Sequence, residues 1–151
     1  MITGYTIEQV LPHAAPMILL SDFIEAGDEH GVCTVRIDEQ SPFYDACQQA
    51  VPSYVGVEYM AQTIAAYAGA NRLARGGQVR IGFLLGCRKY VPVVSGFARG
   101  TELTITATQL VMEQSGLSVF DCQIYQQQQL LVSAKLNVFQ PDDHQAWLRE
   151  S

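Results

Sequence analysis

The side chain best placed for proton chemistry is Glu58, which lies in an otherwise apolar segment ending at Gln62. Apolar residues recur at three- and four-residue steps from residue 54 to residue 73, a pattern that predicts a helix. Glu58 lies near the predicted start of this helix, where free backbone N–H groups stabilise a negative charge. Gln62 shares its face, and its amide can orient the carboxylate or contact a substrate. Two interpretations stay open: a proton-transfer group, or a residue that only helps the helix begin.

Length and composition exclude several classes of protein. The chain has 151 residues, is 48% apolar and carries a formal net charge of −6, which indicates one globular domain spanning residues 1–151. It lacks an unbroken apolar run of about 18 to 20 residues and a secretory signal, so we expect no membrane span and a cytoplasmic location. The four cysteines form no CxxC pair, and we expect neither a metal site nor a protein-bound cofactor.

The basic residues are concentrated in one segment. Six of the nine lie between positions 72 and 99, where there is no Asp or Glu. This distribution argues against nucleic-acid binding and leaves one basic segment that an anionic partner could contact. The alternative is an ordinary solvated surface on which Arg72 and Arg75 complement the negative end of the preceding helix. The six residues are Arg72, Arg75, Arg80, Arg88, Lys89 and Arg99.

The remaining pattern predicts an antiparallel sheet around the helix. A short helix is expected at 7–10, and Ser53 is the expected N-cap of the long one. Because the long helix is apolar nearly all round, it should be buried on most sides. A compact apolar stretch at 17–23 and period-two alternation predict the strands, with glutamines 126–129 at a hairpin turn. The predicted class is α+β, with a curved sheet wrapped around the helix over about residues 54–73. The predicted strands cover 32–37, 79–85, 101–111, 118–125 and 130–138.

Four motifs in a fixed order resemble a known family. The segment 11–22 has a leucine-proline-histidine start, a later proline and a final aspartate, and Pro42-Phe-Tyr44 follows it. The helix carries Val57-Glu58-Tyr-Met-Ala-Gln62, and Gly86-Cys-Arg-Lys89 precedes Pro92. Together these motifs resemble the hotdog-fold 3-hydroxyacyl-acyl-carrier-protein dehydratases of fatty-acid synthesis over nearly the whole chain. The form Gly56-Val-Glu58-Tyr is similar to a divergent branch of hotdog dehydratases associated with aryl-polyene synthesis.

The resemblance implies a function and an assembly. It implies dehydration of a 3-hydroxyacyl thioester, held on the phosphopantetheine of an acyl carrier protein, to the trans-2-enoyl thioester. It also implies a dimer, with itself or with another hotdog subunit, that has acyl tunnels at the interface. Gly56 would offer a backbone N–H to the thioester oxygen. The carrier would contact the basic segment through Arg72, Arg75, Arg88 and Lys89.

The sequence departs from the family pattern at one position. The family's catalytic histidine precedes the helix, whereas the corresponding segment here, 45–52, contains no histidine. Three residues are candidates to replace it: His13, Cys47, or Tyr54 as an acid. His13 is preferred because imidazole titrates near neutral pH, although a structural role in its loop is equally consistent. The other two histidines, His30 and His144, lie in polar sequence and are interpreted as surface residues.

Three functions therefore remain open. The first is an active dehydratase that uses Glu58 and His13. The second is a catalytically incomplete subunit that pairs with an active dehydratase, and the third is an acyl thioesterase that uses the carboxylate to activate water. The enzymatic interpretations share one structural expectation: the Glu58 side chain should lie largely out of water, beside an apolar cavity.

Overall fold

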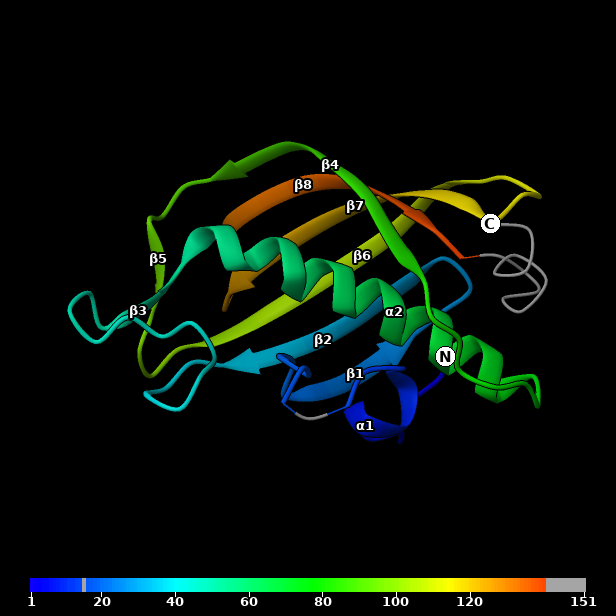
Figure 1. Cartoon of the computed structure of the whole chain (residues 1–151), viewed down its shortest axis with the longest axis horizontal. Helices are drawn as coiled ribbons and strands as arrows, with labels where there is room; N and C mark the ends of the chain where they lie inside the picture. The colour runs from blue at the N-terminus through cyan, green and yellow to red at the C-terminus, as the bar shows by residue number, and fades with distance from the viewer. Residues whose placement is uncertain (15, 141–151) are drawn as a thin grey trace.

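The computed structural model describes residues 1–14 and 16–140 and shows a curved six-stranded antiparallel sheet with one long helix lying across it (Figure 1). The strand order is β1-β2-β6-β7-β8-β4, and β3 and β5 pair separately beyond one end of the helix. The predicted α+β class is confirmed. In chain order the elements are α1 (Ile7–Val10), β1 (Asp22–Ala26), β2 (His30–Arg36), β3 (Ala50–Pro52), a 3-10 turn (Ser53–Val55), α2 (Gly56–Ala74), β4 (Phe83–Pro92), β5 (Gly96–Ala98), β6 (Glu102–Met112), β7 (Leu117–Gln126) and β8 (Gln129–Phe139). No helix within the described residues is long and apolar enough to cross a membrane.

The central strands follow the predicted alternation. On β6 the side chains of Leu103, Ile105 and Ala107 are fully buried, and the polar residues between them point to the other face. The same period of two buries Phe120, Cys122 and Ile124 on β7. The turn between β7 and β8 falls within the glutamine run, where Gln127 takes a positive φ of 55°. Burial of one face of each strand thus positions the sheet beneath α2.

The edges of the sheet differ from the sequence expectation. The apolar stretch 17–23 enters a strand only at Asp22, because residues 17–19 are instead hydrogen bonded to the side chain of Gln62. The strand predicted at 79–85 runs from Phe83 to Pro92. It is an edge strand that pairs only with β8, and most of its side chains are exposed, although Cys87 and Tyr90 pack against the core, so its burial does not follow a period of two.

The helix α2 begins differently from the prediction. Ser53 was expected to cap it, but no side-chain capping bond forms, and the 3-10 turn leads directly into the helix. The Tyr90 hydroxyl donates a hydrogen bond to the Ser53 carbonyl, which fixes this entry to β4. At the other end, Gly76 takes a φ of 80°, and the Gly77 N–H donates to the Arg72 carbonyl at 2.8 Å, closing the last turn.

The expectation that α2 is buried on most sides is confirmed, because ten of its residues are buried and their positions span more than half of its circumference. The packed face lies on the sheet and on α1, and it approaches α1 so closely that a Cβ on Gly69 would collide with the Val10 carbonyl. The opposite face carries Ala61, Ala65 and Ala68, which are only half-buried. This face is only partly filled by other side chains and borders a cavity.

Candidate functional site

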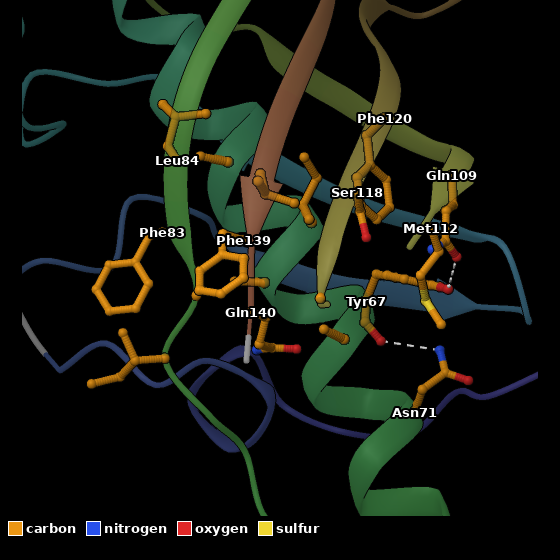
Figure 2. A pocket seen from close by; sticks show the side chains of 18 of the residues that line it. Tyr67, Asn71, Phe83, Leu84, Gln109, Met112, Ser118, Phe120, Phe139 and Gln140 are labelled. Atoms are coloured by element: carbon orange, nitrogen blue, oxygen red, sulfur yellow. Dashed lines mark hydrogen bonds between the residues drawn. The ribbon is translucent and has the colours of Figure 1, made fainter. Parts of the chain in front are cut away.

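A cavity of about 1160 Å³ lies between the unpacked face of α2, the start of β4 and the ends of β6, β7 and β8 (Figure 2). Its walls are mainly apolar, with alanines from the helix and larger side chains from the strands. Glu58 and His13 both line it. The apolar part of the wall includes Ala61, Ile64, Ala65, Ala68, Phe83, Leu84, Met112, Phe120, Val138 and Phe139.

The Glu58 carboxylate is oriented by Gln62. The Gln62 Nε2 donates to Glu58 Oε1 at 3.1 Å and to the Met17 carbonyl at 2.8 Å, and its Oε1 accepts from the Leu19 N–H at 2.9 Å. Gln62 is 1% exposed, and both of its amide hydrogens are engaged, so it has no N–H left to donate to a substrate. Of the two roles predicted for Gln62, the geometry matches the orientation of Glu58.

The expected burial of Glu58 is not met in the single chain. Its side chain is exposed to solvent at the edge of the cavity. The cavity beside it is present, as expected. Of the two expected features of the Glu58 site, the apolar cavity is therefore present, whereas shielding from solvent is not.

His13 reaches the same cavity from the loop that follows α1. The residue is half-buried, and its Nδ1 is buried without a hydrogen-bond partner in the described part of the chain. A buried polar atom without a partner is unfavourable, so this nitrogen would gain from a hydrogen bond that the described residues do not supply. No hydrogen bond joins His13 to Glu58 within the described residues.

Three other predicted site residues lie elsewhere or are already bonded. The Gly56 N–H donates to backbone carbonyls of the 3-10 turn, Ser53 O and Tyr54 O, and is not free for a thioester oxygen. This corrects the prediction: the extra turn moves the unbonded amides of the helix start upstream. Tyr54 is 69% exposed and Cys47 is exposed in a loop, and neither lines the cavity.

The four basic residues predicted to contact the carrier divide into two groups. Arg72 and Arg75, at the end of α2, line the cavity, and Arg72 donates to Gln140 Oε1 at 3.3 Å. Arg88 and Lys89 are exposed on β4 outside the lining, at a bulge where Lys89 has a φ of 55°. Arg99 forms an ion pair with Glu39 at 2.8 Å. The basic segment of the sequence is therefore not one continuous surface at the cavity.

A polar cluster that sequence analysis missed lies at the end of the cavity farther from Glu58 along α2. The Tyr67 hydroxyl contacts the Asp28 carbonyl at 2.5 Å and Gln109 Oε1 at 3.0 Å, and Asn71 lies one turn further along α2 (Figure 2). Burial raises the pKa of Tyr67, and the nearby positive charge of Arg75 opposes that shift. The only advance signal was helical spacing, which places Tyr67 and Asn71 on one side of α2.

The remaining predictions concern histidines and metals. His30 begins β2, and its side chain is 38% exposed and lies 3.0 Å from Glu25, which confirms the interpretation as a surface residue. His144 lies outside the described residues. Among residues 1–14 and 16–140, no group of three or more His, Cys, Asp or Glu side chains is arranged to hold a metal ion.

Known proteins share this architecture. Residues 5–149 match the family model named ApeP-like, described as ApeP dehydratase. The solved dehydratase heterocomplex ApeI:P from Xenorhabdus doucetiae contains a similar chain, with 29% identity, a TM-score of 0.88 and 97% coverage of both chains. No curated protein sequence matches at a significant level.

More distant structures share only the fold. Cj0977 of Campylobacter jejuni is 15% identical with a TM-score of 0.62, covering 91% of this chain and 89% of its own. A hypothetical thioesterase with coenzyme A from Streptococcus pneumoniae is 14% identical with a TM-score of 0.60, covering 78% and 83% respectively. At these identities the likeness is one of architecture.

Proposed function

Because this chain belongs to the ApeP-like dehydratase family, we propose that it dehydrates a 3-hydroxyacyl thioester carried on the phosphopantetheine of an acyl carrier protein. The product is the trans-2-enoyl thioester. One observation carries this assignment to particular residues: Glu58, whose carboxylate is oriented by Gln62, and His13 line the same apolar cavity. We expect the reaction to need no cofactor beyond the carrier's own arm.

The chemistry requires two proton transfers at neighbouring carbons. A base removes the proton from C2, the C3–O bond breaks, and an acid protonates the departing hydroxyl so that it leaves as water. Glu58 and His13 are the two titratable groups that we assign to these steps. The Gln62 hydrogen bond holds the carboxylate in one orientation, which supports transfer along a defined direction.

A second hotdog subunit is expected to complete the site. Glu58 is exposed because its face of α2 is open, and β4 presents an unpaired strand edge beside it. Leu84 and Leu85 on β4 are 42% and 60% exposed, which is typical of surfaces that another chain covers. The similar chain from X. doucetiae belongs to a heterocomplex, which supports pairing with a different hotdog subunit over self-pairing. Such a partner would exclude water from Glu58.

Carrier docking is assigned to the two basic groups defined above. The carrier proteins of this chemistry are acidic, and exposed cations favour their approach. Charge reversal of Arg75, or of Arg88 and Lys89 together, is expected to weaken association with the carrier. The effect should shrink as salt is raised, because exposed charges are screened. An unchanged association would make both groups ordinary solvated surface.

The assignment is tested by following products on the carrier by mass. The full chain, alone and with a candidate hotdog partner, is incubated with a 3-hydroxyacyl carrier protein. We expect loss of one water, slowed about 100-fold or more by Glu58→Gln and strongly by His13→Ala. Glu8→Gln is the matched control, because Glu8 is an exposed carboxylate in the first turn of α1, outside the cavity.

Other products would select the alternatives. If enoyl product forms only when the partner is present, and Glu58→Gln in this chain does not affect it, this subunit shapes a partner's site and lacks its own catalysis. The histidine-free segment 45–52 favours that alternative. Free acid in place of enoyl product would identify a thioesterase.

A further inference from the structure

The far end of the cavity carries four uncharged polar side chains that the reaction above does not use. They are Tyr67 and Asn71 on α2, Gln109 on β6 and Ser118 on β7. Figure 2 shows them converging on the cavity from three elements, with the Ser118 side chain pointing toward the same end as Tyr67. Tyr67 and Ser118 are 9% and 8% exposed and Asn71 and Gln109 are half-buried, so the cluster is partly shielded from water.

The hydrogen bonds within this cluster are incomplete. The Tyr67 hydroxyl has one proton but two acceptors, the Asp28 carbonyl at 2.5 Å and Gln109 Oε1 at 3.0 Å. Asn71 donates both amide hydrogens, to the carbonyls of Gly27 and Tyr67, each at 3.0 Å. Its Oδ1, the Gln109 NH2 group and the Ser118 hydroxyl make no hydrogen bond within the described residues. The cluster can therefore both donate to a ligand and accept from it.

The charges around the cluster select against a charged ligand group. Two cations, Arg72 and Arg75, and two carboxylates, Asp28 and Glu113, line this end of the cavity. Their formal charges cancel, so a charged ligand group inside the cavity gains no net attraction there, whereas Arg75 is exposed and can still meet an acidic partner from outside. An uncharged group with both a donor and an acceptor fits the cluster best, and the two common ones are an amide and a hydroxyl.

The cluster lies at a defined reach from the reacting atoms. With a rise of 1.5 Å per residue, Tyr67 and Asn71 lie roughly 14 and 20 Å along α2 from Glu58. Between Glu58 and Asn71 the helix contributes the small residues Ala61, Ala65 and Ala68 to the cavity wall. Strand β4 contributes Phe83 and Leu84 to the same wall. An apolar passage of this length ends in polar groups, so a ligand with an apolar stretch and a distant polar group matches the whole cavity.

We propose that Tyr67, Asn71, Gln109 and Ser118 form a hydrogen-bonding subsite for an uncharged amide or hydroxyl of the thioester substrate, remote from the reacting carbons. This inference rests on the proposed function for the identity of the ligand. Two parts of such a substrate have the required chemistry: an amide of the pantetheine arm, or a hydroxyl at the far end of the acyl chain. The two sources place the substrate in opposite directions along α2.

The experiment measures binding by calorimetry to the full chain, with three probes that cannot react. The first is pantetheine, and the other two are acyl thioether analogues of equal length that end in a methyl or in a hydroxyl group. Gln109→Leu is compared with wild type and with Gln123→Leu. Gln123 is a matched control, since it lies on β7 outside the cavity and accepts a hydrogen bond from Thr106.

We expect Gln109→Leu to weaken the binding of one probe about tenfold, which corresponds to one lost hydrogen bond. Gln123→Leu should change the affinity for each probe by no more than about twofold. Weakened pantetheine binding would identify the arm as the ligand, whereas weakening of the hydroxyl-ended analogue alone would identify the acyl end. Ser118→Ala should act in the same direction with a smaller effect, which guards against misfolding of Gln109→Leu. Equal binding to wild type and Gln109→Leu, or no binding of any probe, would overturn the subsite.

The subsite and the proposed function fail separately. Enoyl product formed at equal rates by wild type and Gln109→Leu from either acyl end, with unchanged binding, removes the subsite and leaves the dehydratase. Binding that depends on Gln109 without enoyl product keeps the subsite and removes the dehydratase.

Discussion

The two faces of α2 are built from similar residues but differ in what covers them. On the packed face Met60, Thr63 and Ala66 are fully buried against the sheet. On the open face Glu58, Ala61 and Ala65 border a cavity of about 1160 Å³. An amphipathic surface helix would carry a charged stripe on its outer side, whereas this helix carries alanines and one carboxylate there.

The difference separates stability from function on a single helix. Residues of the packed face fill space between α2 and the strands, so their volume and polarity determine the free energy of unfolding. Residues of the open face border the passage beside Glu58, and they are only partly buried within this chain. The four predictions below test this division, in order of the expected change in the free energy of unfolding.

The largest effect is expected for Ala66→Arg on the packed face. Ala66 is 0% exposed, and an arginine there would place an unpaired charge between α2 and the sheet. We expect a loss of about 4 kcal/mol or more, a large part of the stability of an ordinary domain. Urea unfolding followed by circular dichroism measures it. A loss below about 1 kcal/mol would mean that this face is not closely packed.

The second effect concerns Gln62, a buried residue of α2 whose side chain donates a hydrogen bond to Glu58 on the open face. Gln62→Leu removes its three hydrogen bonds and leaves the Leu19 N–H and the Met17 carbonyl without partners. We expect a loss of about 2 kcal/mol, because three partly buried hydrogen bonds are lost and two backbone groups have no replacement partner in the chain. Enoyl formation should also fall, since Glu58 loses its orienting donor.

The control for this change is Gln128→Leu, an exposed glutamine in the turn between β7 and β8. It should alter stability by less than about 0.5 kcal/mol and leave activity intact. If Gln62→Leu loses stability while retaining full activity, the Gln62 contact with Glu58 is structural only.

Much of this fold follows from local patterns in the sequence. Period-two burial identified the strands that have neighbours on both sides, such as β6 with Leu103, Ile105 and Ala107. Helical spacing placed α2 within a few residues of its bounds. The pattern gave the wrong bounds at β4, whose side chains are mostly exposed and do not alternate in burial. It also failed at 17–20, because the 17–19 loop depends on a hydrogen bond to Gln62, more than 40 residues away.

The candidate site was only partly predictable for a similar reason. Glu58 and Gln62 are four residues apart, so their pairing follows from helix geometry. The cluster at Tyr67 joins α2 to the loop after β1 and to β6, and no local pattern connects those segments. The exposure of Glu58 depends on what covers α2 from outside the chain, which strand and helix periodicity does not encode.

The third prediction concerns alkaline pH and a thiol beneath the packed face. Burial raises the pKa of Cys33 from its ordinary value of 9.0 to about 12. Below about pH 9 both the folded and the unfolded chain keep this proton, so the group does not change stability there. Between about pH 9 and 12 only the unfolded chain loses it, so stability should fall by up to about 1.4 kcal/mol per pH unit from this group.

Urea midpoints measured from pH 8 to pH 11 test this expectation. Cys33→Ala should make the alkaline decline shallower, whereas Cys47→Ala should leave its slope unchanged, because Cys47 is exposed. Tyr59, whose pKa burial raises to about 12, adds to the decline in both variants. Equal slopes for the two cysteine variants would show that solvent reaches Cys33.

The smallest effect on stability, and the sharpest separation of the two faces, is expected for Ala65→Arg. Ala65 is the chain neighbour of Ala66 but lines the cavity, so an arginine there keeps its charge in water and should change the free energy of unfolding by less than about 0.5 kcal/mol. The same side chain would block the passage from Glu58 and obstruct any subunit that packs on this face. Sedimentation should therefore show no complex with a hotdog partner, and the enoyl assay should show no product, although the variant unfolds like wild type. If Ala65→Arg associates and turns over normally, the open face of α2 is neither the substrate passage nor the subunit interface, whatever Ala66→Arg does to stability.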